Sequence, residues 1–192
     1  MPRDKSLSRD DLIKNYEKIV NCGCSGVCYD FALNCGLLVL GEKCRKVDKQ
    51  LVQEFTHWGE HGTSEPQVWS IDFMNSFNSG DVLVMVHPND EKVSILMAGK
   101  QSHFMIACDK NQSHFAGINN PATLIAGSNI VSCDCKTGIS IFALGNSNPF
   151  ADKRPEADYQ YVRIPRGNLV EFMNHFSIKI NHSKCCAICT IQ

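Results

Sequence analysis

The sequence predicts an α+β domain in which helices from the first third of the chain pack on a mainly antiparallel sheet. Apolar residues recur at helical spacing up to about residue 77, and short β-rich runs separated by turn signals follow from residue 82. Helices and strands do not alternate, which argues against a parallel sheet. With 192 residues, 43% of them hydrophobic and 20% charged, the chain suits one folded core. We expect a single domain over residues 1–176 and a flexible, cysteine-rich tail over residues 177–192.

The helices are predicted from caps and periodicity. Ser8 is a candidate N-cap for the first helix. The second is expected to be mostly buried, to begin at Cys24 and to end before Gly36, which stands where a C′ glycine would. The predicted helices span residues 9–20, 24–34, 47–55, 68–77 and 169–176.

The strands are predicted from β-branched and aromatic runs bounded by turn residues such as Asn, Asp, Gly and Pro. These runs span residues 82–86, 93–97, 104–108, 114–118, 130–133, 139–144 and 159–164.

The charge and the cysteine content limit the partners and the cellular compartment that we expect for the protein. Nineteen Lys and Arg against twenty Asp and Glu give a net charge of -1, which predicts no nucleic-acid partner. The eleven cysteines are odd in number, and the start of the chain, Met1 to Lys5, is not an apolar export segment. We therefore expect free thiols in a reducing compartment, and no apolar run is long enough to span a bilayer.

A cysteine at the N-terminus of a helix can act as a nucleophile, because the free N–H groups there stabilise its thiolate and can also hold an oxyanion. The run from Cys22 to Cys28 offers three thiols at such a place. Cys24 is the first candidate, since the predicted helix begins with it. Cys28 ranks second, because it is expected one turn deeper in that helix, and Cys22 ranks third. Three ordinary core cysteines are the alternative.

A thiol nucleophile needs a base, and His103 is the best placed of seven histidines because it opens an apolar strand at the rim of the sheet. If residues 109–111 form a hairpin loop, His103 faces Gly117, and a shift of one or two residues places Ile118 or Asn119 opposite it. His114 lies farther along the return strand. We therefore predict Asn119 as the group that orients the imidazole, although a plain turn also explains it.

Three motifs resemble the NlpC-type peptidases of the papain-like superfamily, and they occur in that family's order. Cys24-Ser25-Gly26-Val27 and the apolar positions up to Gly36 resemble its nucleophile helix. The run from Gly80 to Val84 resembles its Gly-Asp strand, and the run from Ser102 to Ile106 resembles the strand that carries its catalytic histidine.

The resemblance implies a papain-like fold, a Cys24–His103 dyad and attack on an amide bond, with no cofactor. Family members use His, Asn or an acid as the third residue, so His114 and Asn119 both stay open. Gly23 stands where the family has Asp, and the stretch between the cysteine and the histidine is longer than usual, so the family's substrate cleft is not carried over.

Two metal sites are possible alternatives to a cysteine nucleophile. His57-Trp58-Gly59-Glu60-His61 fits a zinc-protease pattern if it is helical, but Gly59 disfavours a helix and no third ligand is evident. Cys133 and Cys135 together with Cys22 and Cys24 would form a four-thiolate site, although the usual two-residue spacing is absent. We predict no metal.

The last four residues, Cys189-Thr190-Ile191-Gln192, form a CaaX box of the farnesyl type. Cys185 and Cys186 are candidate acylation sites that would supply the second anchor. Prenylation is eukaryotic chemistry whereas the catalytic motifs look bacterial. Together they resemble bacterial effectors that a secretion system delivers into host cells, where they act at membranes as proteases or deamidases on host proteins. A small GTPase is one candidate substrate, and a peptidoglycan amidase and a non-catalytic binding module are the alternatives.

Overall fold

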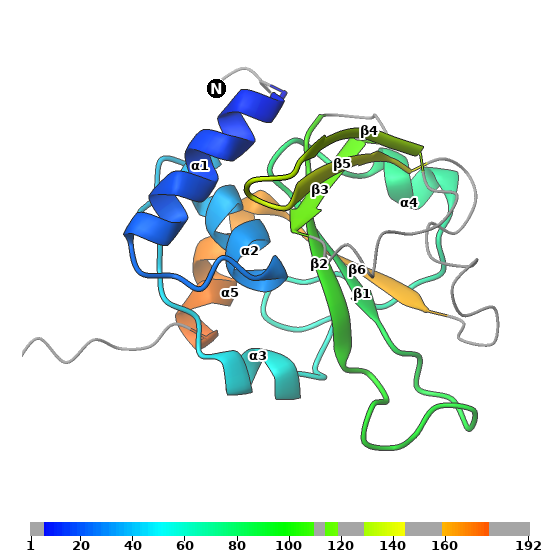
Figure 1. Cartoon of the computed structure of the whole chain (residues 1–192). Helices are drawn as coiled ribbons and strands as arrows, with labels where there is room; N and C mark the ends of the chain where they lie inside the picture. The colour runs from blue at the N-terminus through cyan, green and yellow to red at the C-terminus, as the bar shows by residue number, and fades with distance from the viewer. Residues whose placement is uncertain (1–5, 110–113, 119–128, 145–158, 177–192) are drawn as a thin grey trace, which may run out of the picture.

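The computed structural model describes residues 6–109, 114–118, 129–144 and 159–176. These residues form a mixed α+β domain around a six-stranded antiparallel sheet, as predicted (Figure 1). The spatial order of the strands is β4-β5-β3-β2-β1-β6. The strands are β1 (Val82–Val86), β2 (Gln101–Ala107), β3 (His114–Ile118), β4 (Asn129–Asp134), β5 (Ile139–Ala143) and β6 (Gln160–Ile164).

The helices lie close to the predicted segments with one important exception. The first begins after Ser8, whose side chain and that of Asp11 form a capping box. The α-helices are α1 (Arg9–Asn21), α2 (Cys28–Val39), α3 (Lys49–Glu54), α4 (Ile71–Asn75) and α5 (Leu169–Phe176). In the described part of the chain, no helix has the length and apolar character needed to cross a membrane.

The exception is α2, which begins at Cys28 and not at Cys24 and continues through Gly36 to Val39. The backbone turns before it, because Gly23 and Gly26 both adopt positive φ angles, 76° and 66°. Gly36 therefore lies inside the helix and does not end it. A side chain there would crowd Leu169 and approach the carbonyl oxygen of Gly80 to 3.0 Å, so this glycine lets α2 lie close against α5 and the start of β1.

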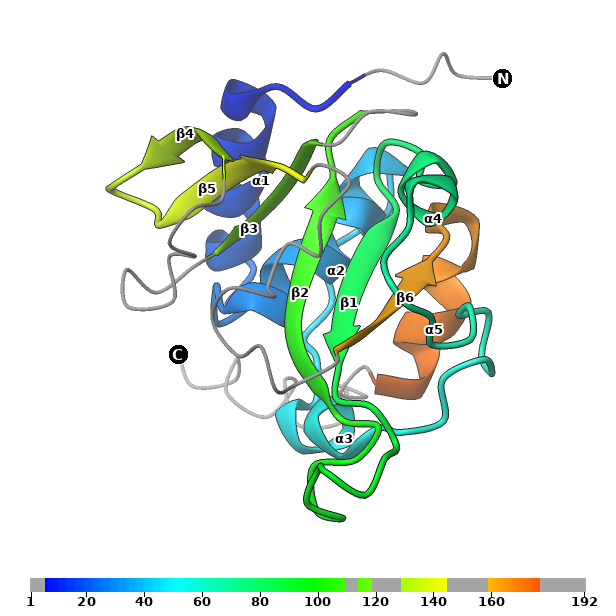
Figure 2. The same cartoon turned by 90° about the vertical axis from the view of Figure 1, so that its right-hand side faces the viewer.

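The prediction of a strand over residues 93–97 was also wrong. This segment belongs to a long connection between β1 and β2 that is built from turns, and Ile95, Leu96 and Met97 within it are exposed. Its apolar run therefore does not pair with the sheet. Figures 1 and 2 both show this connection projecting beyond the lower end of the sheet.

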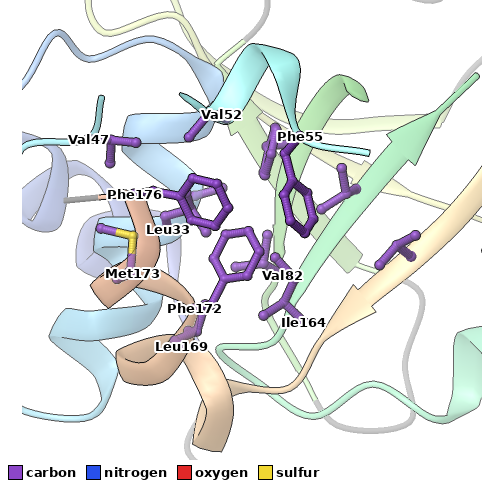
Figure 3. Close-up of a cluster of buried hydrophobic side chains, with 14 of the residues drawn as sticks. Leu33, Val47, Val52, Phe55, Val82, Ile164, Leu169, Phe172, Met173 and Phe176 are labelled. Carbon is purple, nitrogen blue, oxygen red and sulfur yellow. The ribbon is translucent and has the colours of Figure 1, made fainter. Parts of the chain in front are cut away.

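The sheet is covered on both faces. On one face, α2 and α5 pack against side chains of β1, β2 and β6, and Phe55, Phe172 and Phe176 fill the centre of this cluster (Figure 3). On the other face, Phe73 of α4 packs with Met105 and Tyr161. Since neighbours in a strand point to opposite faces, Phe104 and Ile106 of β2 lie toward α2, whereas Met105 and Ala107 lie away from it.

Candidate active site

Cys24 lies in the loop between α1 and α2, with only 8% of its surface exposed. Its sulfur contacts the carbonyl oxygen of Arg45 at 3.6 Å and the amide nitrogen of Asn34 at 3.8 Å. Burial, and after it the charge of Asp30, raises the pKa of the Cys24 thiol to about 11. The expectation that Cys24 sits at a helix N-terminus as a stabilised thiolate was therefore wrong, because the glycine turns delay the helix by four residues.

Cys28 occupies the position that was predicted for Cys24. It is the first residue of the 12-residue helix α2, and its side chain is half-buried. Burial raises the pKa of the Cys28 thiol, while hydrogen bonds from the backbone of Phe104, Tyr29 and Cys28 itself act to lower it. Cys28 is thus the thiol that combines a helix N-terminus with converging backbone donors.

The loop before Cys28 is held by Asp30, the third residue of α2. The Asp30 carboxylate accepts hydrogen bonds from the backbone N–H of Ser25, at 3.0 Å, and from the Ser25 hydroxyl. These bonds tie the loop at Ser25 to the first turn of α2. The negative charge of Asp30 also opposes ionisation of Cys28, so this thiol needs a base to give up its proton.

The contact with Phe104 places Cys28 at one edge of β2. The N–H of Ala107 donates to Asp81 on the β1 side, and because successive N–H groups of a strand alternate in direction, the N–H of Phe104 points toward the β3 side. In the described residues, β3 pairs with β2 only at Ile106 and Ala107. The Cys28 sulfur therefore lies beside the part of β2 that precedes its pairs with β3 at Ile106 and Ala107.

His103 precedes Phe104 in the same strand, but its side chain lies on the face of the sheet that carries Met105, away from α2 and Cys24. A Cβ atom added to Gly117 of β3 would lie 3.3 Å from His103 Nε2, so the imidazole leans toward the β3 side and uses the space left by this glycine. The structure thus does not bring Cys24 and His103 together. It places His103 and Cys28 on either side of the same edge of β2.

The predicted third residue, Asn119, lies outside the described residues. The pairs Ile106–Ala116 and Ala107–Phe115 set the register of the hairpin, and this is the register shifted by two from the one with His103 opposite Gly117.

His114 does not orient His103. Its carbonyl accepts from the N–H of Cys108 at 2.9 Å, so it lies about 16 Å along β2 from His103. Its Nδ1 pairs with the carboxylate of Asp109 at 2.8 Å.

The Gly-Asp motif has a structural role. Asp81 is buried, and its carboxylate binds the Arg163 side chain at 2.7 Å and the backbone N–H of Arg166 at 2.8 Å. This ion pair joins the start of β1 to β6, the neighbouring strand. The motif therefore fixes the frame of the sheet.

Neither metal pattern forms the arrangement it requires. His57 and His61 follow the end of α3 in a turn, where Gly59 and His61 have positive φ angles of 91° and 51°, so they share no helical face. Across the residues that the structure describes, no three His, Cys, Asp or Glu side chains come together as a metal site. Cys22 instead contacts Cys44, and burial together with this neighbour raises the pKa of Cys44 to about 12.

Comparison with known proteins adds no assignment. No family model, curated protein or solved structure matches the chain. The interpretation of this site therefore depends on its own geometry.

Sequence reasoning ranked Cys28 second, and a local signal for it was present. Gly26 two residues before Cys28 and an acidic residue two residues after it are typical of a turn followed by the first turn of a helix. The contact between the Cys28 sulfur and the Phe104 backbone left no such signal, because it joins segments 76 positions apart.

Proposed function

We propose that this protein is a papain-like cysteine hydrolase, in which Cys28 is the nucleophile and His103 is the base, and that its lipidated tail holds it at a membrane. The observation that supports the catalytic part is the place of Cys28 as the first residue of the 12-residue helix α2, where nearby backbone N–H groups act to lower the pKa of its thiol. One of them comes from Phe104, the residue next to the candidate base. Cys24, with its buried sulfur and raised pKa, is assigned a packing role.

The proposed reaction is an ordinary acyl transfer. The Cys28 sulfur attacks the carbonyl carbon of an amide, its proton passes to the His103 imidazole, and the amide nitrogen leaves with that proton. Water then cleaves the thioester and restores the thiol. The net change is the addition of water across the amide, which yields a carboxylate and either an amine or ammonia. The amide N–H groups at the start of α2 would hold the oxyanion in both steps.

This proposal requires the imidazole to reach around the β3-side edge of β2, where His103 and Cys28 flank the strand. Catalytic hydrogen bonds often form only when substrate binds, and here the step needs the His103 imidazole to move toward Cys28 when it does. Asn119 remains the proposed orienting residue, since in the sequence it directly follows β3, the strand that pairs with the strand of His103.

The test is site-resolved alkylation of the native chain by iodoacetamide between pH 6 and 9, read by peptide mass spectrometry. We expect Cys28 to react faster than the exposed Cys133, with a pH profile that contains the titration of an imidazole. His103→Ala should slow Cys28 about tenfold and remove that step, whereas His57→Ala, which changes an exposed histidine, should have no effect. If Cys28 reacts no faster than Cys133 and ignores His103, the catalytic proposal is wrong and a non-catalytic binding module takes its place.

The membrane part of the proposal comes from the tail, and Cys185, Cys186 and Cys189 lie outside the described residues. The CaaX box supports farnesylation of Cys189, and the pair before it supports acylation. Such a tail serves an effector that a bacterium delivers into a host cell and that acts on a membrane-bound host protein, such as a small GTPase. It has no use in a cell-wall amidase. Mass spectrometry of the C-terminal peptide after expression in eukaryotic cells tests it directly, with Cys189→Ser as the control.

A further inference from the structure

We propose that the tip of the β1–β2 connection, Ile95, Leu96 and Met97, is a second membrane contact that inserts into the lipid interface beside the tail. The three residues are consecutive and 90%, 72% and 42% exposed, respectively. Scattered exposed apolar side chains are common, but three adjacent ones at the end of a projecting loop form a patch that calls for a partner. This inference rests on the proposed lipidation of the tail.

The loop is held in shape by its own hydrogen bonds. At its base, His87 and Lys100 pair through their backbones at 2.9 Å, as do Gly99 and His87. Near its tip, the N–H of Met97 donates to the carbonyl of Ser94 at 2.7 Å. The exposed side chains therefore stand on an ordered turn, so little conformational entropy is lost when they enter a lipid surface.

The base of the loop lies close to the point from which the tail departs. The indole of Trp58 donates to the carbonyl oxygen of Gly99 at 2.7 Å, Trp58 packs on Phe55 at a ring distance of 4.6 Å, and Phe55 packs on Phe176 at 5.1 Å. Phe176 is the last residue of α5, and the 16 residues that follow it end in the CaaX box. Two ring contacts and one hydrogen bond thus connect the start of the tail with the loop.

The length and charge of the chain beyond Phe176 fit a membrane partner. Sixteen residues reach at most about 55 Å when extended, which is ample for a lipidated Cys189 and the loop tip to touch one bilayer. Residues 177–192 contain two lysines and no acidic residue, which suits an anionic headgroup surface. Within the loop, Asp90 and Glu91 balance Lys92 and Lys100, so its own affinity for lipid comes from the apolar tip.

A single prenyl chain gives only weak, reversible binding, so a second contact has a large effect on residence at the membrane. The inference is tested with the full chain farnesylated in vitro and vesicles of phosphatidylcholine and phosphatidylserine. Replacing both Ile95 and Leu96 by Ser should weaken vesicle binding at least tenfold. The matched control replaces two exposed apolar residues by Ser: Val68, three residues before α4, and Ile71, the first residue of α4. Figures 1 and 2 show α4 toward the other end of the sheet. The control should bind like the unsubstituted protein.

A second arm separates the loop from the lipid modification. The chain is given a C-terminal hexahistidine tag and tethered to vesicles that contain a nickel-chelating lipid, so that no prenyl group is needed. Leu96→Trp should then show a blue-shifted emission that brominated lipids quench, whereas Val68→Trp should not. Unchanged emission at position 96, or equal binding of the Ile95 and Leu96 variant, overturns the inference. If the loop inserts but Cys189 accepts no prenyl group in cells, only the proposed tail modification fails.

Discussion

Cys24 and Cys28 lie four residues apart, yet different groups surround their sulfur atoms. Cys24 is enclosed by Asn34 and the Arg45 carbonyl, and its pKa is raised to about 11. Cys28 is the first residue of a helix, and backbone N–H groups of that helix and of β2 act to lower the pKa of its thiol, against the effect of burial. The motif that resembles a known nucleophile contains the first cysteine, whereas the start of the helix lies at the second. A helix start displaced by one turn is enough to exchange their surroundings.

The largest effect is expected from Asn34→Ala, which removes the support of Cys24. Asn34 is fully buried. Its side-chain oxygen accepts from the backbone N–H of Arg45 at 2.7 Å, and its side-chain nitrogen donates to the Arg45 carbonyl oxygen at 3.1 Å. The buried amide is lost and two part-buried backbone groups of Arg45 lose their partner, so the free energy of unfolding should fall by about 3 kcal/mol in urea denaturation. Asn168→Ala, which removes one half-buried bond to Gly62, should cost about 1 kcal/mol. Equal losses would show that Asn34 does not support the Cys24 loop.

The second effect is a loss of stability at alkaline pH. Burial raises the pKa of Cys24 to about 11 and that of Cys35 to about 12, whereas both thiols ionise near 9 in the unfolded chain. Each protonated thiol therefore contributes fully to the free energy of unfolding below pH 9. This contribution is lost as the pH rises from 9 toward 11 for Cys24 and toward 12 for Cys35. Each thiol should lower the free energy of unfolding by about 1 kcal/mol at pH 10. Urea midpoints at pH 8 and 10 measure this, and Cys24→Ala with Cys35→Ala should flatten the dependence. If the loss of stability between pH 8 and 10 is the same in these variants, other titrating groups cause it.

The third effect compares the two thiols directly. At pH 7.5 a thiol with a pKa of about 11 is ionised to about 0.03%, so Cys24 should react slowly with iodoacetamide. Cys28 should react at least tenfold faster in the native protein. In 8 M urea the two rates should converge, because the unfolded chain gives both sulfurs the same solvent. Faster alkylation of Cys24 than of Cys28 in the native state would restore the assignment from the sequence motif.

The smallest effect concerns the turn that separates the two cysteines. Gly26 has a φ angle of 66°, and a Cβ atom there would lie 3.3 Å from the Tyr16 ring. Gly26→Ala should cost about 0.5 kcal/mol more than Gly41→Ala, because Gly41 has a similar φ angle of 79° but open space around it. Urea denaturation of both variants gives the difference, and only Gly26→Ala should alter the alkylation rate of Cys28. If both variants behave alike, crowding by Tyr16 does not shape the turn.

The sequence by itself determined the class of the fold and most of its elements. Periodicity and caps are local signals, so the helix after Ser8, the closing helix from Leu169 and the strand from Val82 appear where they were predicted. The run at residues 93–97 has the composition of a strand but lies in a projecting loop, because strand pairing depends on a partner and composition does not supply one.

The tertiary structure decided what the site contains. The positive φ angles of Gly23 and Gly26 moved the start of α2, and the alternation of side chains along β2 placed His103 on the face opposite Cys24. The contact between Cys28 and Phe104 arises from packing a helix against a strand 76 residues away. Such contacts follow from the relative placement of whole elements, whereas residue types and spacing report on one segment at a time.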